Sequence, residues 1–181
     1  WAQRMGDSVG GIVECRVLGV PIGIGEPFFD SVESVMSHAM FSIPGVKGIE
    51  FGSGFSGAAM GGSENNDPFA MRGDDVVLLK NDAGGILGGI SNGQPIVFRL
   101  ALKPTPSIAR PQSTVNLQTG EDTIIRVEGR HDPCIVPRAV PAIEAAASVV
   151  IADLVNRWNC ISDRVDRDSD RLLFSDRNQR F

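Results

Sequence analysis

The sequence is organised around residues 84–108, which read GGILGGISNGQPIVFRLALKPTPSI. This stretch begins with a glycine-rich bend, continues through a strand, and ends in a corner that contains two prolines. Glycine clusters allow another group to approach the backbone closely. Because each proline fixes φ and keeps the preceding residue extended, the corner also fixes where Lys103, Thr105 and Ser107 project. A lysine beside two hydroxyl side chains suits an anionic phosphate ligand; an ordinary surface loop with an exposed lysine is the alternative.

The strand within this stretch, residues 96–102, alternates apolar side chains with others. Since successive side chains of a strand point to opposite faces, its apolar face consists of Ile96, Phe98, Leu100 and Leu102. Arg99 and Lys103 share the opposite face, which points both cations to the same side of the sheet.

A second stretch, residues 129–134, reads GRHDPC and places Arg130, His131 and Asp132 on consecutive positions. An exposed ion pair, which contributes little to stability, is one explanation. A metal site is another, because this triplet and the cysteine after it include three possible ligands. Zinc sites normally need further ligands at recognisable spacing, and the only other histidine is His38. We therefore predict no metal here.

The glycine pattern does not fit the common nucleotide-binding motifs. Residues 84–93 do not match G-x-G-x-x-G, and a strand follows them where a dinucleotide-binding fold needs a helix. A bulged turn between two strands is the simpler interpretation. The chain also has no G-x-x-x-x-G-K-[ST] motif, and serine hydrolysis is poorly supported because no G-x-S-x-G elbow is present.

The rest of the pattern predicts an α+β fold. β-branched or alternating apolar residues predict four further strands, at residues 12–18, 46–51, 76–79 and 122–128. The third of these is apolar throughout and is expected to be buried. Apolar residues at helical spacing predict two helices, at residues 31–41 and 141–157. Residues 52–73 are rich in glycine and polar side chains and are expected to form a long loop, functional or mobile.

The helix boundaries carry their own signals. Asp30 is predicted to be the N-cap of the first helix, with Glu33 completing a capping box. Pro141 is expected in the first turn of the second helix, where proline is tolerated. The buried stripe of that helix is expected to comprise Ile143, Ala147, Val150, Ile151, Leu154 and Trp158. After Trp158 the pattern ends in alternating Asp and Arg, so residues 158–181 are expected to form a divergent, disordered tail.

Bulk properties narrow the class of protein. A chain of 181 residues with 42% hydrophobic content and a net charge of −5 is expected to form one globular domain that does not bind nucleic acid. Three widely spaced cysteines indicate a reducing compartment rather than a disulfide framework. We identify no apolar run of the ~20 residues that span a bilayer, so no membrane partner is expected. The chain begins at Trp1 without a methionine and looks like a piece of something longer.

Taken together, these stretches resemble chorismate synthase. The resemblance runs in one register from about Gly6 to Val155 and corresponds to the C-terminal part of the family's chain. The matching residues are 6–11 (GDSVGG), 23–27 (GIGEP), 42–48 (SIPGVKG), 62–64 (GSE), 83–94, 103–108, 129–134 and 138–141 (RAVP). The family's N-terminal part, which has a second functional histidine and an arginine-rich substrate segment, is not represented.

The resemblance implies a partial β-α-β sandwich over residues 1–157 and a cofactor, reduced FMN. The family converts 5-enolpyruvylshikimate 3-phosphate to chorismate by a 1,4-anti elimination of phosphate, in the shikimate pathway. Its catalytic carboxylate, near flavin N5, falls on Asp132, and a carboxylate beside a cation should accept protons. The flavin contacts fall on Pro44, Gly45, Gly88, Lys103, Pro104, Thr105, Pro106, Ser107 and Arg130.

The family is further expected to form cytoplasmic homotetramers, and its flavin is reduced either by another enzyme or by an NADPH-dependent activity of its own. The alternative is a non-catalytic, truncated module that at most binds a flavin or another phosphate ligand. Both hypotheses depend on one arrangement. The corner at Lys103 and the turn at Arg130 should come together in space, and their placement on opposite sides of the molecule would exclude a shared flavin site.

Overall fold

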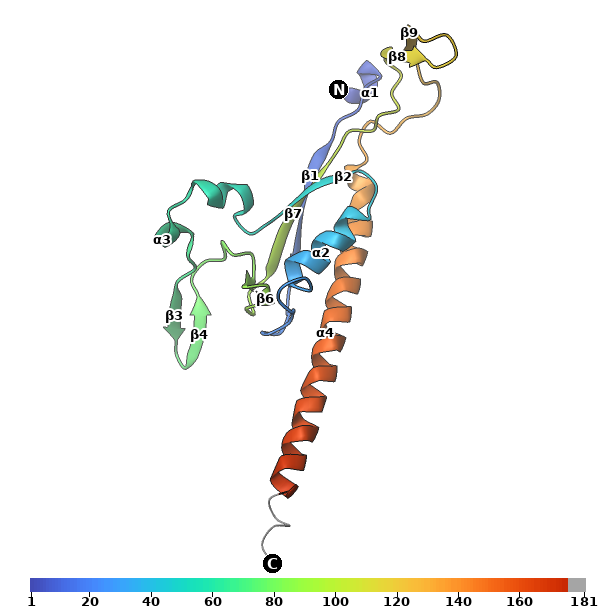
Figure 1. Ribbon diagram of the computed structural model, residues 1–181. Helices are drawn as coiled ribbons and strands as arrows, with labels where there is room; N and C mark the ends of the chain where they lie inside the picture. Colours follow the sequence, from blue (N-terminus) through green and yellow to red (C-terminus); the bar gives the residue numbers. More distant parts are fainter. Residues whose placement is uncertain (176–181) are drawn as a thin grey trace, which may run out of the picture.

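The computed structural model describes the backbone of residues 1–175 and the side chains of residues 1–160 (Figure 1). Its centre is an antiparallel sheet of three strands in the order β1-β7-β2. These are β1 (Gly11–Val17), β7 (Ile96–Leu102) and β2 (Val46–Phe51). The predictions of strands at 12–18, 46–51 and 96–102 are therefore confirmed. Leu102 of β7 pairs with Gly11 and Val46, and Ile96 pairs with Val17 at the other end.

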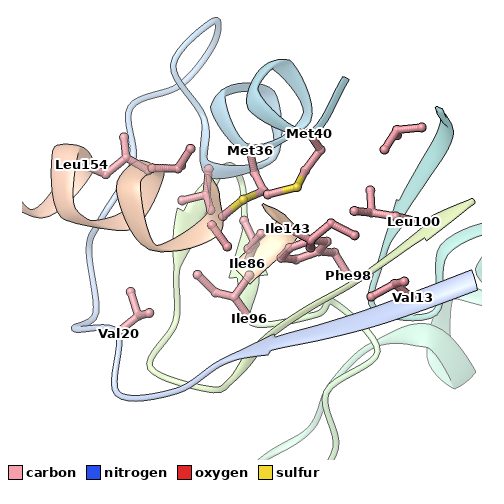
Figure 2. Packing of buried hydrophobic residues seen from close by; sticks show 14 of the residues in the cluster. Val13, Val20, Met36, Met40, Ile86, Ile96, Phe98, Leu100, Ile143 and Leu154 are labelled. Carbon is pink, nitrogen blue, oxygen red and sulfur yellow. The ribbon is translucent and has the colours of Figure 1, made fainter. Parts of the chain in front are cut away.

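Two helices, α2 (Val32–Phe41) and α4 (Val136–Ser175), pack against one face of this sheet. The apolar face predicted for β7 is buried there, with all four of its side chains at most 4% exposed. Figure 2 shows Phe98 and Ile143 packed beneath the sulfur atoms of Met36 and Met40. The α+β class is thus confirmed. Among the described residues this chain contributes one sheet layer and one helix layer of a sandwich.

The N-cap of α2 is Ser31, not Asp30 as predicted. The Ser31 hydroxyl accepts a hydrogen bond from the backbone N–H of Ser34 at 3.1 Å. Asp30 is used elsewhere, because its carbonyl accepts from Glu26 N–H and its carboxylate lies 3.6 Å from the Arg157 guanidinium. Both residue types can cap a helix, and here Ser31 supplies the cap while the Asp30 carboxylate lies near Arg157.

Helix α4 begins at Val136, five residues before the predicted start, so Pro141 lies in its second turn and not in the first. The predicted stripe is largely confirmed: Ile143, Ala147, Val150 and Leu154 are buried and Ile151 is partly buried. Trp158 is 40% exposed.

The helix also runs through the boundary expected at residue 157 and continues to Ser175. The division of the chain at that residue stays a prediction. Residues 176–181 of that predicted tail lie outside the described residues. By length and composition alone, Val136–Cys160 could cross a membrane, so the expectation that no run is long enough is also corrected. This is a weak indication, because one side of the same helix packs in the core.

The remaining elements lie around this centre. Strands β3 (Phe69–Arg72) and β4 (Asp75–Leu78) form a separate two-stranded hairpin. Val76 is 66% exposed and Leu79 63% exposed, so the prediction of a buried strand at 76–79 is wrong. The predicted loop 52–73 contains the 3-10 helix η1 (Gly54–Ala59), the short helix α3 (Gly62–Asn65) and β3.

The glycine-rich bend forms the predicted turn between strands as a small hairpin of β5 (Ile86–Leu87) and β6 (Ile90–Ser91). Strand β9 (Glu121–Ile125) is shorter than predicted and pairs with β8 (Gln112–Asn116), which was not predicted. The β8–β9 hairpin and the N-terminal helix α1 (Ala2–Met5) lie at the same end of the molecule in Figure 1.

Candidate functional site

The corner at residues 103–107 follows directly from β7, so the sheet positions it. The backbone N–H of Lys103 donates to the carbonyl of Gly45 at 2.9 Å. The carbonyl of Thr105 accepts a hydrogen bond from the Ser8 hydroxyl at 2.6 Å. Lys103, Pro104 and Pro106 are exposed, whereas Thr105 and Ser107 are partly buried. The corner therefore leaves its cation exposed, whereas its two hydroxyl residues are partly buried.

Pro44 and Gly45 form the turn between α2 and β2, and this turn lies against the corner. Gly45 has a φ of +94°, which side chains other than glycine rarely adopt. A Cβ at Gly45 would lie 2.9 Å from Cδ1 of Ile135, the residue immediately before α4. The turn therefore hydrogen-bonds to the Lys103 corner through the Gly45 carbonyl. The absence of a side chain at Gly45 allows Ile135, at the start of α4, to pack closely against the turn.

Residues 129–134 connect the β8–β9 hairpin to α4. The carbonyl of Pro133 accepts a hydrogen bond from Val9 N–H at 2.9 Å, and the His131 Nε2 atom lies 3.0 Å from the carbonyl of Val127. Arg130 is exposed. The partner of Asp132 is Arg138, in the first turn of α4, whose Nη1 donates to Asp132 Oδ2 at 2.6 Å. The cation that contacts Asp132 is therefore Arg138 and not Arg130, because α4 begins early enough to bring Arg138 to it.

The structure thus brings three of the predicted segments to one end of the sheet: Pro44 and Gly45, residues 103–107, and residues 129–134. Residues 6–11 lie between the last two and hydrogen-bond to both, through Ser8 and Val9. The arrangement that would exclude a shared site, with the corner and the Arg130 turn on opposite sides, is not found.

We call these three segments the cluster, and Gly88 is not part of it. It lies at the exposed tip of the β5–β6 hairpin, and the neighbouring Gly89 accepts a hydrogen bond from Val32 N–H at the beginning of α2. Pro44 follows the opposite end of α2. Ten helical residues span about 15 Å, so Gly88 is separated from the other predicted contacts by roughly that length.

The residues of the cluster fit a phosphate-bearing ligand such as FMN. The Thr105 Oγ1 atom is buried and has no hydrogen-bond partner among the described residues, which leaves a hydroxyl available to a ligand. Within residues 1–160, no ion pair involves Lys103 or Arg130, so both cations are available to an anion. The described residues contain no group of three His, Cys, Asp or Glu side chains that could hold a metal ion.

A hollow of about 150 Å³ lies beside the cluster, lined by Gln3, Gly6, Asp7, Ala109, Gly129, His131 and Pro133. Pockets for small molecules and cofactors usually measure roughly 300–1,000 Å³. The hollow can therefore receive part of a cofactor, such as a phosphate group, but not a whole flavin nucleotide.

Sequence reasoning did not assign Asp7, Ser8 or Arg110 to this region. Arg110 Nη1 donates to Asp7 Oδ2 at 2.8 Å. The N–H of Ser8 and then the guanidinium of Arg110 lower the pKa of Asp7 below 3.8. The two partners are 103 residues apart in the chain, so no local pattern could have revealed the pair.

Comparisons with known proteins agree with this description. The family model for chorismate synthase matches residues 1–155. The chain is 52% identical over 160 residues to the chorismate synthase of Dehalococcoides mccartyi, covering 88% of this chain and 44% of the relative. It is 55% identical over 156 residues to that of Korarchaeum cryptofilum, covering 86% and 43%.

With the chorismate synthase of Methanosarcina acetivorans the identity is 55% over 162 residues, covering 90% of this chain and 44% of the relative. A crystal structure of chorismate synthase superposes with a TM-score of 0.67 and 31% identity, covering 84% of this chain and 39% of that one. The chain therefore spans less than half the length of the curated relatives that it matches.

Proposed function

The chain belongs to the chorismate synthase family, a family of lyases, and we propose that it forms the C-terminal, flavin-binding part of such an enzyme. The observation that carries the proposal is the convergence of three segments, the Pro44 and Gly45 turn, residues 103–107 and residues 129–134, at one end of the sheet. The polar groups gathered there, two exposed cations and a buried hydroxyl without a partner, are complementary to a phosphate-bearing cofactor.

In this proposal Lys103 and Arg130 bind the negative charge of FMN, and Thr105 and Ser107 donate hydrogen bonds to it. Pro104 and Pro106 keep that segment rigid, so little conformational entropy is lost on binding. Pro44, Gly45 and Gly88 allow the cofactor to approach the backbone closely. Because Gly88 lies about the length of α2 away, its contact would be with a different part of the cofactor.

Asp132 is the proposed proton acceptor. Its ion pair with Arg138 restrains the carboxylate, which lies two residues from Arg130 and so beside the proposed cofactor site. Reduced FMN, when bound, supplies electron density to the allylic system from which phosphate leaves. Within this chain, Lys103 and Arg130 contribute positive charge, and Asp132 takes up a proton lost from the substrate ring.

The substrate of the complete enzyme is proposed to be 5-enolpyruvylshikimate 3-phosphate, converted to chorismate with loss of phosphate. Since the chain spans 43–44% of the three relatives above, we propose that the missing length supplies the remaining walls of the site and most of the substrate contacts. The small volume of the hollow supports this division. Homotetramer formation, NADPH-dependent flavin reduction and a cytoplasmic location are proposed for the complete enzyme only.

The second candidate is a non-catalytic module that binds a flavin or another phosphate ligand. The same small hollow favours it for the isolated chain. Titration of the purified chain with FMN, followed by flavin absorbance and fluorescence, tests binding. Addition of substrate under reducing conditions, followed by chorismate absorbance, then tests activity. We expect binding without product; product from this chain alone would overturn the proposed division, and no FMN binding would remove the flavin-binding proposal and leave only a module for another phosphate ligand.

The role of Asp132 is tested in a chimaera in which the missing part of the Methanosarcina acetivorans relative precedes Trp1. Asp132→Asn keeps the size of the side chain and removes its basicity, so we expect FMN binding to persist and turnover to fall by about 100-fold or more. Asp122→Asn, in the exposed strand β9, is the matched control. Undiminished turnover of the Asp132 variant would remove this residue from the mechanism.

A further inference from the structure

Residues 6–11 cross the candidate site between its two main segments. On one side they bond to the chain around the Lys103 corner. The Ser8 hydroxyl donates to the Thr105 carbonyl at 2.6 Å, and Ala109 N–H donates to the Gly6 carbonyl at 3.1 Å. The segment is therefore attached to the corner at two points, of which one is a side chain.

On the other side, the same residues bond to the segment that carries Arg130 and Asp132. Val9 N–H donates to the Pro133 carbonyl at 2.9 Å. A Cβ on Gly11 would lie 3.0 Å from Cγ2 of Val136, at the beginning of α4. The two faces of this short segment thus contact two parts of the site that are separated by more than twenty residues of chain.

Gly10 shows how closely the segment is packed. A Cβ at this position would lie 2.3 Å from the carbonyl oxygen of Leu102 and 3.2 Å from Cδ of Pro104. Because real Cβ atoms do not approach a backbone oxygen so closely, only glycine allows this contact. The segment is held directly against the start of the corner, and a small displacement of one would displace the other.

We infer that Ser8 is a positioning residue for the cofactor site, an inference that rests on the proposed flavin-binding function. A hydroxyl that donates to the Thr105 carbonyl fixes the orientation of that peptide group. The neighbouring Thr105 Oγ1 atom is left buried and without a partner, and Lys103 is held two residues away. Since the single proton of the Ser8 hydroxyl is already donated to the carbonyl, Ser8 acts on the ligand through Thr105 and not by direct donation.

The test compares the FMN dissociation constants of four forms of the chain: wild type, Ser8→Ala, Ser8→Thr and Ser63→Ala. Loss of one neutral hydrogen bond is expected to weaken FMN binding about threefold to tenfold in Ser8→Ala. Ser8→Thr keeps the hydroxyl and should restore both affinity and the visible difference spectrum of the bound flavin. Ser63 is exposed and has no side-chain hydrogen bond among the described residues, so its variant should match the wild type.

Amide hydrogen exchange supplies a readout that does not require the cofactor. In Ser8→Ala, exchange at Ala109 N–H should accelerate about threefold to tenfold, while Val32 N–H, bonded to Gly89 at the far end of the sheet, should be unchanged. Equal acceleration at both amides would show general destabilisation and would overturn a positioning role.

The outcomes separate this inference from the proposed function. FMN affinity equal to the wild type in Ser8→Ala overturns the inference and leaves the proposed function intact. If the wild type itself binds no FMN, the proposed function fails, and the exchange rate at Ala109 alone decides whether Ser8 holds the corner. An unchanged rate there overturns the inference in either case.

Discussion

The two ends of the central sheet have similar residues but differ in how their side chains are packed and hydrogen-bonded. At the end where β7 begins, Ile96 and Ile24 are fully buried, and the side chain of Ser91 is satisfied twice. The Ser91 hydroxyl donates to the Pro21 carbonyl at 2.6 Å and accepts from Ile24 N–H at 2.9 Å. At the end where β7 finishes, Thr105 Oγ1 is buried without a partner. We call these the closed end and the open end.

The difference shows that glycine content alone does not indicate a ligand site. At the closed end a Cβ on Gly25 would lie 2.5 Å from the Gly89 carbonyl, and one on Gly89 would lie 2.7 Å from the Ser31 Cβ. Those glycines allow the chain to pack against itself. Each end holds one buried polar atom without a partner among the described residues, Asn92 Nδ2 beside Ser91 and Thr105 Oγ1 at the open end. What distinguishes the open end is its pair of exposed cations, Lys103 and Arg130, which have no ion pair within residues 1–160.

The largest expected effect is at the closed end. Ile24 is fully buried, so Ile24→Ala should lower the free energy of unfolding by about 2–5 kcal/mol through lost burial and the cavity left behind. Urea unfolding followed by circular dichroism measures the change. Ile12→Ala is the control, because Ile12 is 68% exposed and its variant should differ from the wild type by no more than about 0.5 kcal/mol. Equal losses in both variants would contradict a closed and packed end.

Arg130→Ala should have the opposite profile at the open end. Its side chain is exposed and has no ion pair within residues 1–160, so the free energy of unfolding should change by about 0.5 kcal/mol or less. Loss of a charge-assisted hydrogen bond to FMN should weaken binding by about 1.5–3 kcal/mol, or roughly 10- to 150-fold. Isothermal titration with FMN measures this, and Arg126→Ala is the control for a lost cation nearby. Similar affinities for both variants would remove Arg130 from the site.

Ser91→Ala tests the closed end more finely. The substitution leaves Ile24 N–H and the Pro21 carbonyl without the partner that now satisfies them, and unpaired buried groups cost about 1–3 kcal/mol. Thermal unfolding should therefore show a lower midpoint for Ser91→Ala than for Ser113→Ala, in which the serine is exposed. A midpoint equal to the wild type would mean that water replaces the hydroxyl and that this end is less closed than its burial indicates.

The periodicity of apolar residues was sufficient to predict the elements that form the buried core. The alternation of Ile96, Phe98 and Leu100 predicted β7 because a strand buried on one face repeats every second residue. The spacing of Ile143, Ala147, Val150 and Leu154 predicted the buried side of α4 in the same way. An apolar run without alternation was not sufficient, since residues 76–79 read as buried but belong to an exposed hairpin.

The open end depends on contacts between residues that are far apart in the chain, and these the sequence could not predict. Ser8 and Thr105 are 97 residues apart, and neither lies in a periodic element. The ion pair of Asp132 was not predicted because it depends on where α4 begins: the helix starts at Val136 and brings Arg138 within reach. The residue types at the open end indicate that an anionic ligand could bind there, but only the fold shows which hydrogen-bond and ion-pair partners these residues have.

The smallest expected effect concerns the Asp7–Arg110 ion pair at the open end. The N–H of Ser8 and the Arg110 guanidinium lower the pKa of Asp7 in the folded chain, so the folded state binds a proton at this carboxyl less tightly than the unfolded state. The stabilisation is therefore present above about pH 4 and is lost as the pH falls through the lowered pKa.

Asp7→Asn, which keeps an acceptor for Ser8 N–H but no charge, should be slightly less stable than the wild type at pH 6. That difference should shrink below pH 3.8, the ordinary pKa of the group. Thermal midpoints of both forms between pH 2.5 and 6 measure it. A difference that is constant over this range would mean that the ion pair does not hold residues 6–11 against the open end, and that Ser8 and Val9 do so without it.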